Sequence, residues 1–294
     1  MITLRRGIPD DARPAFDLSL AAMSDLFARQ GVEWELDPEA FWKDLEPFVS
    51  HLAATAAEWW VAIDEADGSL VGYARSVERG RLFELSELFV RPGRQSAGLG
   101  RQLIERAFPA GRGDVRLIIA TTDVRALKRY YGAGTVVRFP IASLGGAPQP
   151  GDAGELEAVS ATLDDVAELA AIEEAVIGYP RHAEYPWLIE HRQGYLYRRD
   201  GRAVGFAFVS PGGQGPIAAL EPADQVAILR HAEGRAHALG IESVSFEVPM
   251  VNEVAMRHLF GRGFRIEPPL MILMSSVPFG AFDRFIVFGP PIVL

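Results

Sequence analysis

The amino-acid sequence predicts two tandem domains of the mixed α/β (α+β) class, each a mostly antiparallel twisted sheet flanked by helices. The 294 residues suffice for two ordinary domains. An Asp-Gly turn between apolar runs, typical of a β-hairpin, occurs at 67–68 and again at 200–201. The helical pattern 123–134 recurs at 252–263. Repeats in the same order indicate a duplicated domain.

The elements of the first domain follow from local patterns. Alternating apolar residues predict strands, Asp-Gly predicts the hairpin turn, and Asp10-Asp11 predicts the start of a helix, as Asp164-Asp165 does in the second copy. A stretch with Leu103, Ile104 and Ala107 on one side predicts an amphipathic helix. The expected order is strand 2–6, helix 10–29, a helical stretch, strands 59–65, 69–78 and 82–90, helix 98–108, strand 115–120, helix 123–132 and strand 135–141.

The domain boundary is expected just after Leu144. Residues 145–154 are rich in Gly and Pro, which is typical of a linker, and a shorter copy of the domain then occupies 155–276. The first domain would therefore span 1–144. Residues 277–294 form an apolar tail. We expect this tail to pack on the body of the protein, because exposed apolar segments favour aggregation.

Composition excludes several function classes. The net charge of −10 argues against nucleic acid as a partner. The chain has no cysteine, so a thiolate metal site is excluded, and its histidines show no tight ligand pairing, so no metal is expected. No run of 18 apolar residues predicts a membrane span, and a cytoplasmic location is expected.

The glycine-rich turn at 95–100 carries the strongest functional signal. It joins a predicted strand to a predicted helix. Backbone amides at the start of a helix, together with the helix dipole, bind phosphate oxygens, and glycine lets the ligand approach the backbone. Taken alone, such glycines more often belong to an ordinary turn than to a phosphate site.

The surrounding residues give this turn a family resemblance. Gln95-x-x-Gly98-x-Gly100, preceded by Phe89-Val90-x-Pro92, resembles motif A of the GNAT superfamily of acyl-CoA-dependent N-acyltransferases. The later Ala126, Tyr130 and Gly134 resemble motif B. The resemblance covers residues 1–141, and residues 155–276 resemble a degenerate second copy of the kind found in tandem members.

The resemblance implies a site for acetyl-CoA as co-substrate. Pantetheine would pair with the motif A strand near Leu88, Phe89 and Val90, and the Leu88 N–H would face the thioester oxygen. Asp123 replaces the asparagine that usually contacts pantetheine, and the alternative role for Asp123 is a helix cap. The diphosphate would lie on Gln95, Ser96, Ala97, Gly98, Leu99, Gly100 and Arg101.

Two proton-transfer roles follow from the same resemblance. Glu84 stands where several members keep a general base. Strand alternation would put Glu84 and Glu87 on opposite faces unless a bulge intervenes, so Glu87 is the alternative candidate for the base. Tyr130 stands where members keep the acid that protonates the thiolate, with Tyr131 as a less favoured substitute. The alternatives are an exposed sheet carboxylate and a packed helix tyrosine.

The second copy lacks these features. Its loop near 219–230 contains no glycine, and Leu259 replaces the tyrosine, so this copy is interpreted as structural. The predicted function is transfer of an acetyl group to a primary amine of a small cationic acceptor by direct attack in a ternary complex. The alternative is a non-catalytic acyl-CoA sensor or assembly module. The sequence leaves a homodimer and the identity of the acceptor open.

Overall fold

The computed structural model describes residues 1–33, 36–94, 98–211 and 213–289. The chain forms two compact units. Unit 1 comprises Met1–Val137 and Met274–Val277, and unit 2 comprises Arg138–Leu273 and Pro278–Leu294. Within each unit, helices flank a sheet whose strands are mostly antiparallel, which confirms the predicted fold class.

Unit 1 contains five strands in the order β1-β2-β3-β4-β5. All neighbours are antiparallel except β4 and β5, which are parallel. Its elements are β1 Ile2–Arg6, a 3-10 turn Pro9–Asp11, α1 Ala12–Gln30, α2 Pro38–Thr55, β2 Glu58–Asp64, β3 Leu70–Arg79, β4 Leu82–Val90, α3 Leu99–Ala107, β5 Val115–Thr121 and α4 Val124–Gly132.

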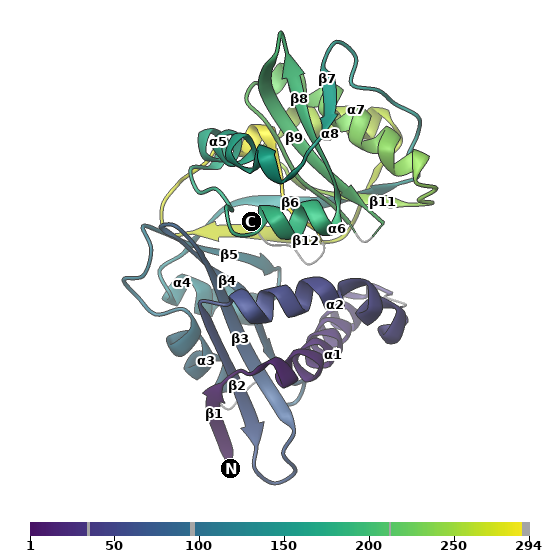
Figure 1. Ribbon diagram of the computed structural model, residues 1–294. Coiled ribbons are helices and arrows are strands. Elements are labelled where there is room, and N and C mark those ends of the chain that lie inside the picture. The colour runs from purple at the N-terminus through teal and green to yellow at the C-terminus, as the bar shows by residue number, and fades with distance from the viewer. Residues whose placement is uncertain (34–35, 95–97, 212, 290–294) are drawn as a thin grey trace. The chain divides into compact units, whose positions relative to one another are not determined.

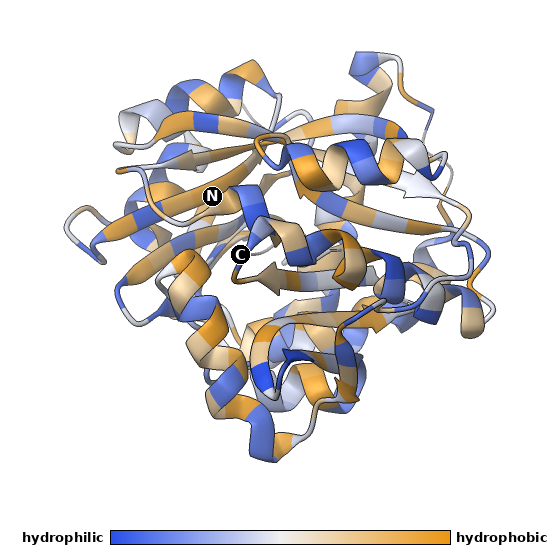
Figure 2. Ribbon diagram, turned by 90° about the horizontal axis from the view of Figure 1, so that it is seen from above, coloured by the Kyte–Doolittle hydropathy of each residue, from blue (hydrophilic) through white to orange (hydrophobic). Residues whose placement is uncertain are grey.

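Helices cover both faces of this sheet (Figure 1). On one face, Phe16 of α1 and Val49 of α2 pack with Tyr73 of β3 in a buried cluster. On the other face, Leu103 of α3 lies close to Gly72 of β3, where a Cβ would stand 3.1 Å from Leu103 Cδ1. Burial of these apolar side chains holds the helices on the strands. Figure 2 shows both hydrophobic and hydrophilic residues along the helices of the chain, as expected of helices that bury one face and expose the other.

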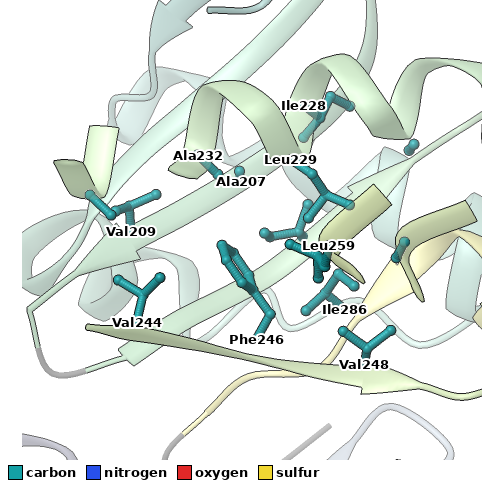
Figure 3. Packing of buried hydrophobic residues seen from close by; sticks show 14 of the residues in the cluster. Ala207, Val209, Ile228, Leu229, Ala232, Val244, Phe246, Val248, Leu259 and Ile286 are labelled. Atoms are coloured by element: carbon teal, nitrogen blue, oxygen red, sulfur yellow. The ribbon is translucent and has the colours of Figure 1, made fainter. Parts of the chain in front are cut away.

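Unit 2 repeats this plan. Its five-stranded sheet has the order β13-β10-β9-β8-β7, and β6 pairs antiparallel with β11. Its helices and strands are β6 Val136–Gly146, β7 Glu157–Ser160, α5 Val166–Ile177, α6 Tyr185–His191, β8 Gln193–Arg199, β9 Arg202–Ser210, β10 Gly213–Ala219, α7 Pro222–Ala238, β11 Val244–Pro249, α8 Glu253–Gly261, β12 Arg265–Ser275 and β13 Phe285–Ile286. A single apolar cluster joins α7 and α8 to β9, β10 and β11 (Figure 3).

The compact units differ from the expected ranges at β6. This strand runs through Gly146, so Gly145 and Gly146 are strand residues rather than linker. They pair with Ser245 and Val244 of β11. Strand pairing, which is non-local, overrides the glycine signal here.

A short segment from late in the chain completes unit 1. Met274–Val277 belongs to that unit. The Ser276 N–H donates to the Arg116 carbonyl at 2.9 Å, and the Arg116 N–H donates to Ser276 Oγ at 3.0 Å. Only Met274 and Ser275 of β12 belong to unit 1, and the rest of that strand belongs to unit 2.

Candidate active site

The two central strands of unit 1 pair over only part of their length. β4 and β5 pair from Leu82 with Val115 to Leu85 with Ile118, and the structure shows no further pairing between them in the described residues. Beyond this point β4 carries a bulge, because Ser76 pairs with Leu85 and Arg75 with Glu87, which leaves Ser86 as an extra residue. Bulges bend a strand and disrupt its ladder. We call the unpaired region between the ends of β4 and β5 the β4–β5 gap.

The amide of Leu88 is directed toward this gap. The Arg91 N–H donates to the Val71 carbonyl of β3 at 2.9 Å. Because backbone N–H groups alternate between the two sides of a strand, the N–H of Leu88, which pairs with Ala74, points away from β3. The gap therefore offers one edge of β4 for pairing with an extended ligand.

Helix α3 begins next to this edge with an unusual cap. Gly98 is its N-cap in a left-handed conformation (φ 76°), which favours glycine, and no side chain caps the helix. The Gly98 carbonyl accepts from the N–H groups of Arg101 and Gln102 at 3.1 and 3.2 Å. The amides of Leu99 and Gly100 in the first turn can therefore bind an anion.

The other expected loop residues divide into two groups. Gln95, Ser96 and Ala97 lie outside the described residues. Arg101 is described, and its side chain is 77% exposed.

Arg129 of α4 is a functional candidate that the sequence analysis missed. Its Nε lies 3.6 Å, and its Cζ 3.7 Å, from where a Cβ at Gly100 would stand. The guanidinium therefore lies against the first turn of α3. Its position directly before Tyr130 was the only signal in the sequence, and that position says nothing about which way the side chain points.

The bulge places both candidate carboxylates on one face of β4. Glu84 pairs with Val77 and Glu87 with Arg75, and these two partners lie on the same face of β3. The expected placement on opposite faces is therefore wrong. Glu84 is 1% exposed, and its carboxylate lies 3.4 Å from Arg79 Nη1. The Glu87 side chain retains 16% exposure.

Glu87 is held by two buried neighbours. It accepts a hydrogen bond from the Tyr73 hydroxyl at 2.8 Å and lies 3.2 Å from Arg75 Nε. The Arg75 side chain is buried, its guanidinium lies 4.5 Å from the Trp59 ring centre, and its Nη1 donates to the Val49 carbonyl. Burial and the charge of Glu87 raise the pKa of Tyr73. Tyr73 thus stays protonated and keeps donating to the carboxylate.

Tyr130 lies on α4 and is 7% exposed. Burial, and secondarily the charge of Asp123, raise the pKa of its phenol well above 10. The hydroxyl is therefore protonated at neutral pH and can act as a proton donor. Tyr131, the less favoured substitute, is 51% exposed.

Asp123 caps α4. Its carboxylate accepts from the Arg125 N–H at 2.9 Å and from Arg125 Nη2 at 2.9 Å. The hydrogen bond from the Arg125 side chain is the main reason that the pKa of Asp123 falls to about 2. Of the two roles expected for Asp123, the structure shows the helix cap.

The described residues contain no group of three or more metal-ligating side chains placed to hold an ion. Across the same residues, every helix is too short or too polar to cross a bilayer.

Comparisons with known proteins identify a family match for part of the chain and solved structures of similar fold. Residues 20–133 match the model of the Acetyltransferase (GNAT) family. A candidate acetyltransferase from Pyrococcus horikoshii has 16% identity and a TM-score of 0.74, with 97% of this chain and 92% of that chain covered. A GCN5-related N-acetyltransferase from Sphaerobacter thermophilus has 18% identity and a TM-score of 0.62, with 93% and 95% covered. A tandem GNAT protein from the clavulanic acid biosynthesis pathway has 15% identity and a TM-score of 0.57, with 95% and 99% covered. No curated protein sequence matches.

The family match implies acetyl transfer that depends on an acyl-CoA. Residues 20–133 belong to the GNAT acetyltransferase family, and the two repeats fit the tandem arrangement within that family. This part of the chain is thus a GNAT acetyltransferase domain.

Proposed function

We propose that unit 1 transfers the acetyl group of acetyl-CoA to a primary amine of a small cationic acceptor, by direct attack in a ternary complex. The β4–β5 gap carries this proposal, because it presents the Leu88 amide at the edge of a strand next to the start of α3. The net charge of −10 favours the approach of a cation.

The described residues fit the coenzyme. The left-handed cap at Gly98 leaves the amides of Leu99 and Gly100 for the diphosphate, and the Arg129 guanidinium lies against the same turn. The edge of β4 from Leu88 to Val90 suits the two amides of pantetheine, which can pair as an added strand would. Gln95, Ser96, Ala97 and Arg101 are proposed to complete the phosphate site.

The chemistry requires one proton acceptor and one proton donor. The ammonium of the acceptor must lose a proton before its nitrogen attacks the thioester carbonyl. The C–N bond then forms and the C–S bond breaks. The Leu88 N–H is placed to stabilise the negative charge on the carbonyl oxygen, and the Tyr130 phenol gives its proton to the departing thiolate.

We assign the role of proton acceptor to Glu87 in preference to Glu84. Both carboxylates lie on the α1–α2 face of β4. Only Glu87 is partly exposed and lies beside the gap, whereas Glu84 is 1% exposed and pairs with Arg79 in the fully paired part of the strand. Tyr73 and Arg75 hold Glu87 in position.

The test compares Glu87→Gln with Glu84→Gln, two isosteric changes on one strand. We expect Glu87→Gln to lower kcat by about 10²- to 10⁴-fold while leaving acetyl-CoA affinity unchanged. Glu84→Gln should reduce kcat far less. Release of free thiol across a panel of amines gives the rate, and calorimetry gives the affinity. A large loss confined to Glu84→Gln would transfer the role to Glu84. Coenzyme binding without thiol release for any amine would favour a sensor.

A further inference from the structure

The second repeat contains a counterpart of the β4–β5 gap. Its strands β9, β10 and β11 and its helices α7 and α8 follow the order of β3, β4, β5, α3 and α4. β10 carries a register shift between Gln214 and Ile217, as β4 does near Ser86. The side chain of Asn252 caps α8, as that of Asp123 caps α4. The corresponding gap in unit 2 therefore lies between β10 and β11.

A segment from the end of the chain occupies this β10–β11 gap. β13 pairs antiparallel with β10, with Ile286 opposite Ile217 and Phe285 opposite Ala218. The next residue, Val287, forms an antiparallel bridge to Glu247 of β11, and its N–H donates to the Glu247 carbonyl at 3.1 Å. Three consecutive residues thus connect the two strands.

Polar groups of unit 2 bind the backbone of this segment along its length. Nδ2 of Asn252, whose Oδ1 caps α8, donates to the Phe285 carbonyl at 3.4 Å. The Gly289 N–H donates to the Gln214 carbonyl at 3.2 Å. Arg192 donates from Nη2 to the Gly289 carbonyl at 3.0 Å, and its guanidinium lies 3.9 Å from the ring centre of Phe288. These contacts bind amide groups, as a pantetheine site would.

The segment is also buried. Phe285, Ile286 and Val287 are fully buried, and Phe288 is 2% exposed. Ile286 belongs to the main apolar cluster of the unit, where Figure 3 shows it near Leu259 and Val248. The backbone of β10 also fits the segment closely, because a Cβ at Gly215 would stand 2.6 Å from the Val287 carbonyl oxygen.

The remaining features of this repeat oppose a coenzyme. Asp224 lies in the first turn of α7, is 6% exposed and accepts from Arg199 Nη2 at 2.6 Å. A carboxylate at that helix start takes the place that a diphosphate would need. Leu259, which replaces the tyrosine, is fully buried in the core.

We infer that Phe285–Gly289 is the internal ligand of the second repeat, an extended peptide that permanently fills the place where the first repeat receives pantetheine. The chain should therefore bind one acyl-CoA, in unit 1 only. The inference rests on the proposed function only in taking acetyl-CoA as the ligand of the β4–β5 gap.

The first test cuts the chain without removing the segment. A recognition sequence for a specific protease is inserted after Val277, which is 44% exposed, and the folded protein is cleaved there. We expect the cleaved C-terminal fragment to co-elute with the rest of the chain on gel filtration. If the fragment dissociates instead, the melting temperature of the rest of the chain should fall. A fragment that leaves while the melting temperature stays unchanged would overturn the inference. In the cleaved protein, Ile286→Ala should speed fragment loss at least tenfold, whereas the matched change Val277→Ala should not.

The second test uses the intact chain. Calorimetric titration with acetyl-CoA should give one site per chain, and two sites would refute the inference. If no acetyl-CoA binds, the proposed function fails, but the cleavage experiment still decides whether the segment is a ligand of unit 2. The two failures are therefore distinguishable.

Discussion

The carboxyl group of Glu247 should make the chain less stable as the pH rises. It lies on β11 and is 6% exposed. Ser143 donates to Oε1 at 3.1 Å, while Oε2 is buried with no hydrogen-bond partner in the described structure. Burial, aided by the charge of Glu267, raises the pKa of Glu247 from 4.5 to about 7, and the Ser143 hydrogen bond only partly opposes this.

The size and sign of the effect follow from proton linkage. The folded chain binds this proton more tightly than the unfolded chain, so the associated stability is complete below pH 4.5 and is lost as the pH rises to about 7. A pKa difference of about 2.5 corresponds to about 3 kcal/mol at about 1.4 kcal/mol per unit. Glu247→Gln removes the titration. Relative to the wild type, this variant should therefore gain about 3 kcal/mol between pH 4.5 and 8.

Urea unfolding at several pH values measures this gain. A matched change, Glu267→Gln, removes only the neighbouring charge and should recover a minor part of the effect. If the difference between Glu247→Gln and the wild type is the same at pH 4.5 and pH 8, the carboxyl group does not titrate as its burial requires, and the reasoning is refuted.

Three further predictions concern unit 1. Tyr130→Phe should lower kcat at least tenfold with an unchanged KM for acetyl-CoA in steady-state assays, and an unchanged kcat would remove Tyr130 from the mechanism. Gly98 and Gly68 both have a left-handed backbone and open space around the Cβ position, so Gly98→Ala and its control Gly68→Ala should each lower the free energy of unfolding by about 1 kcal/mol in urea. Only Gly98→Ala should also weaken acetyl-CoA binding in calorimetry. Asp123→Ala should cost about 1 kcal/mol by loss of the cap, while Asp123→Asn should cost far less; equal losses in thermal melts would contradict the capping role.

Local patterns were sufficient to predict most of the fold. Strand β4 begins and ends where alternation predicted, and α3 buries Leu103, Ile104 and Ala107 as its amphipathic pattern required. Asp123 begins α4 by accepting from its first turn. In each of these cases the information lies within one element and its immediate neighbours.

Features that depend on distant partners could not be predicted in this way. The bulge at Ser86 has no residue signature, yet it brings Glu84 and Glu87 to one face. Gly145 and Gly146 resemble a linker, but the first lies against the Glu267 side chain and the second against the Phe264 ring. Such contacts exist only once the strands have paired, so the sequence could show the repeat but not the pairing.

The proposed function and the inferred internal ligand together predict one coenzyme site in two similar repeats. Partial pairing of two parallel strands leaves backbone groups that need partners, and buried backbone groups without partners are costly. The first repeat has glycine at the start of α3, where we propose that a diphosphate anchors a ligand whose amides pair with that strand edge. The second repeat has Asp224 at the start of α7 and satisfies its strands with Phe285–Gly289. Under the proposed function, the first repeat leaves its strand edge free for a ligand that binds and dissociates, whereas the second repeat pairs its strands with a segment of its own chain.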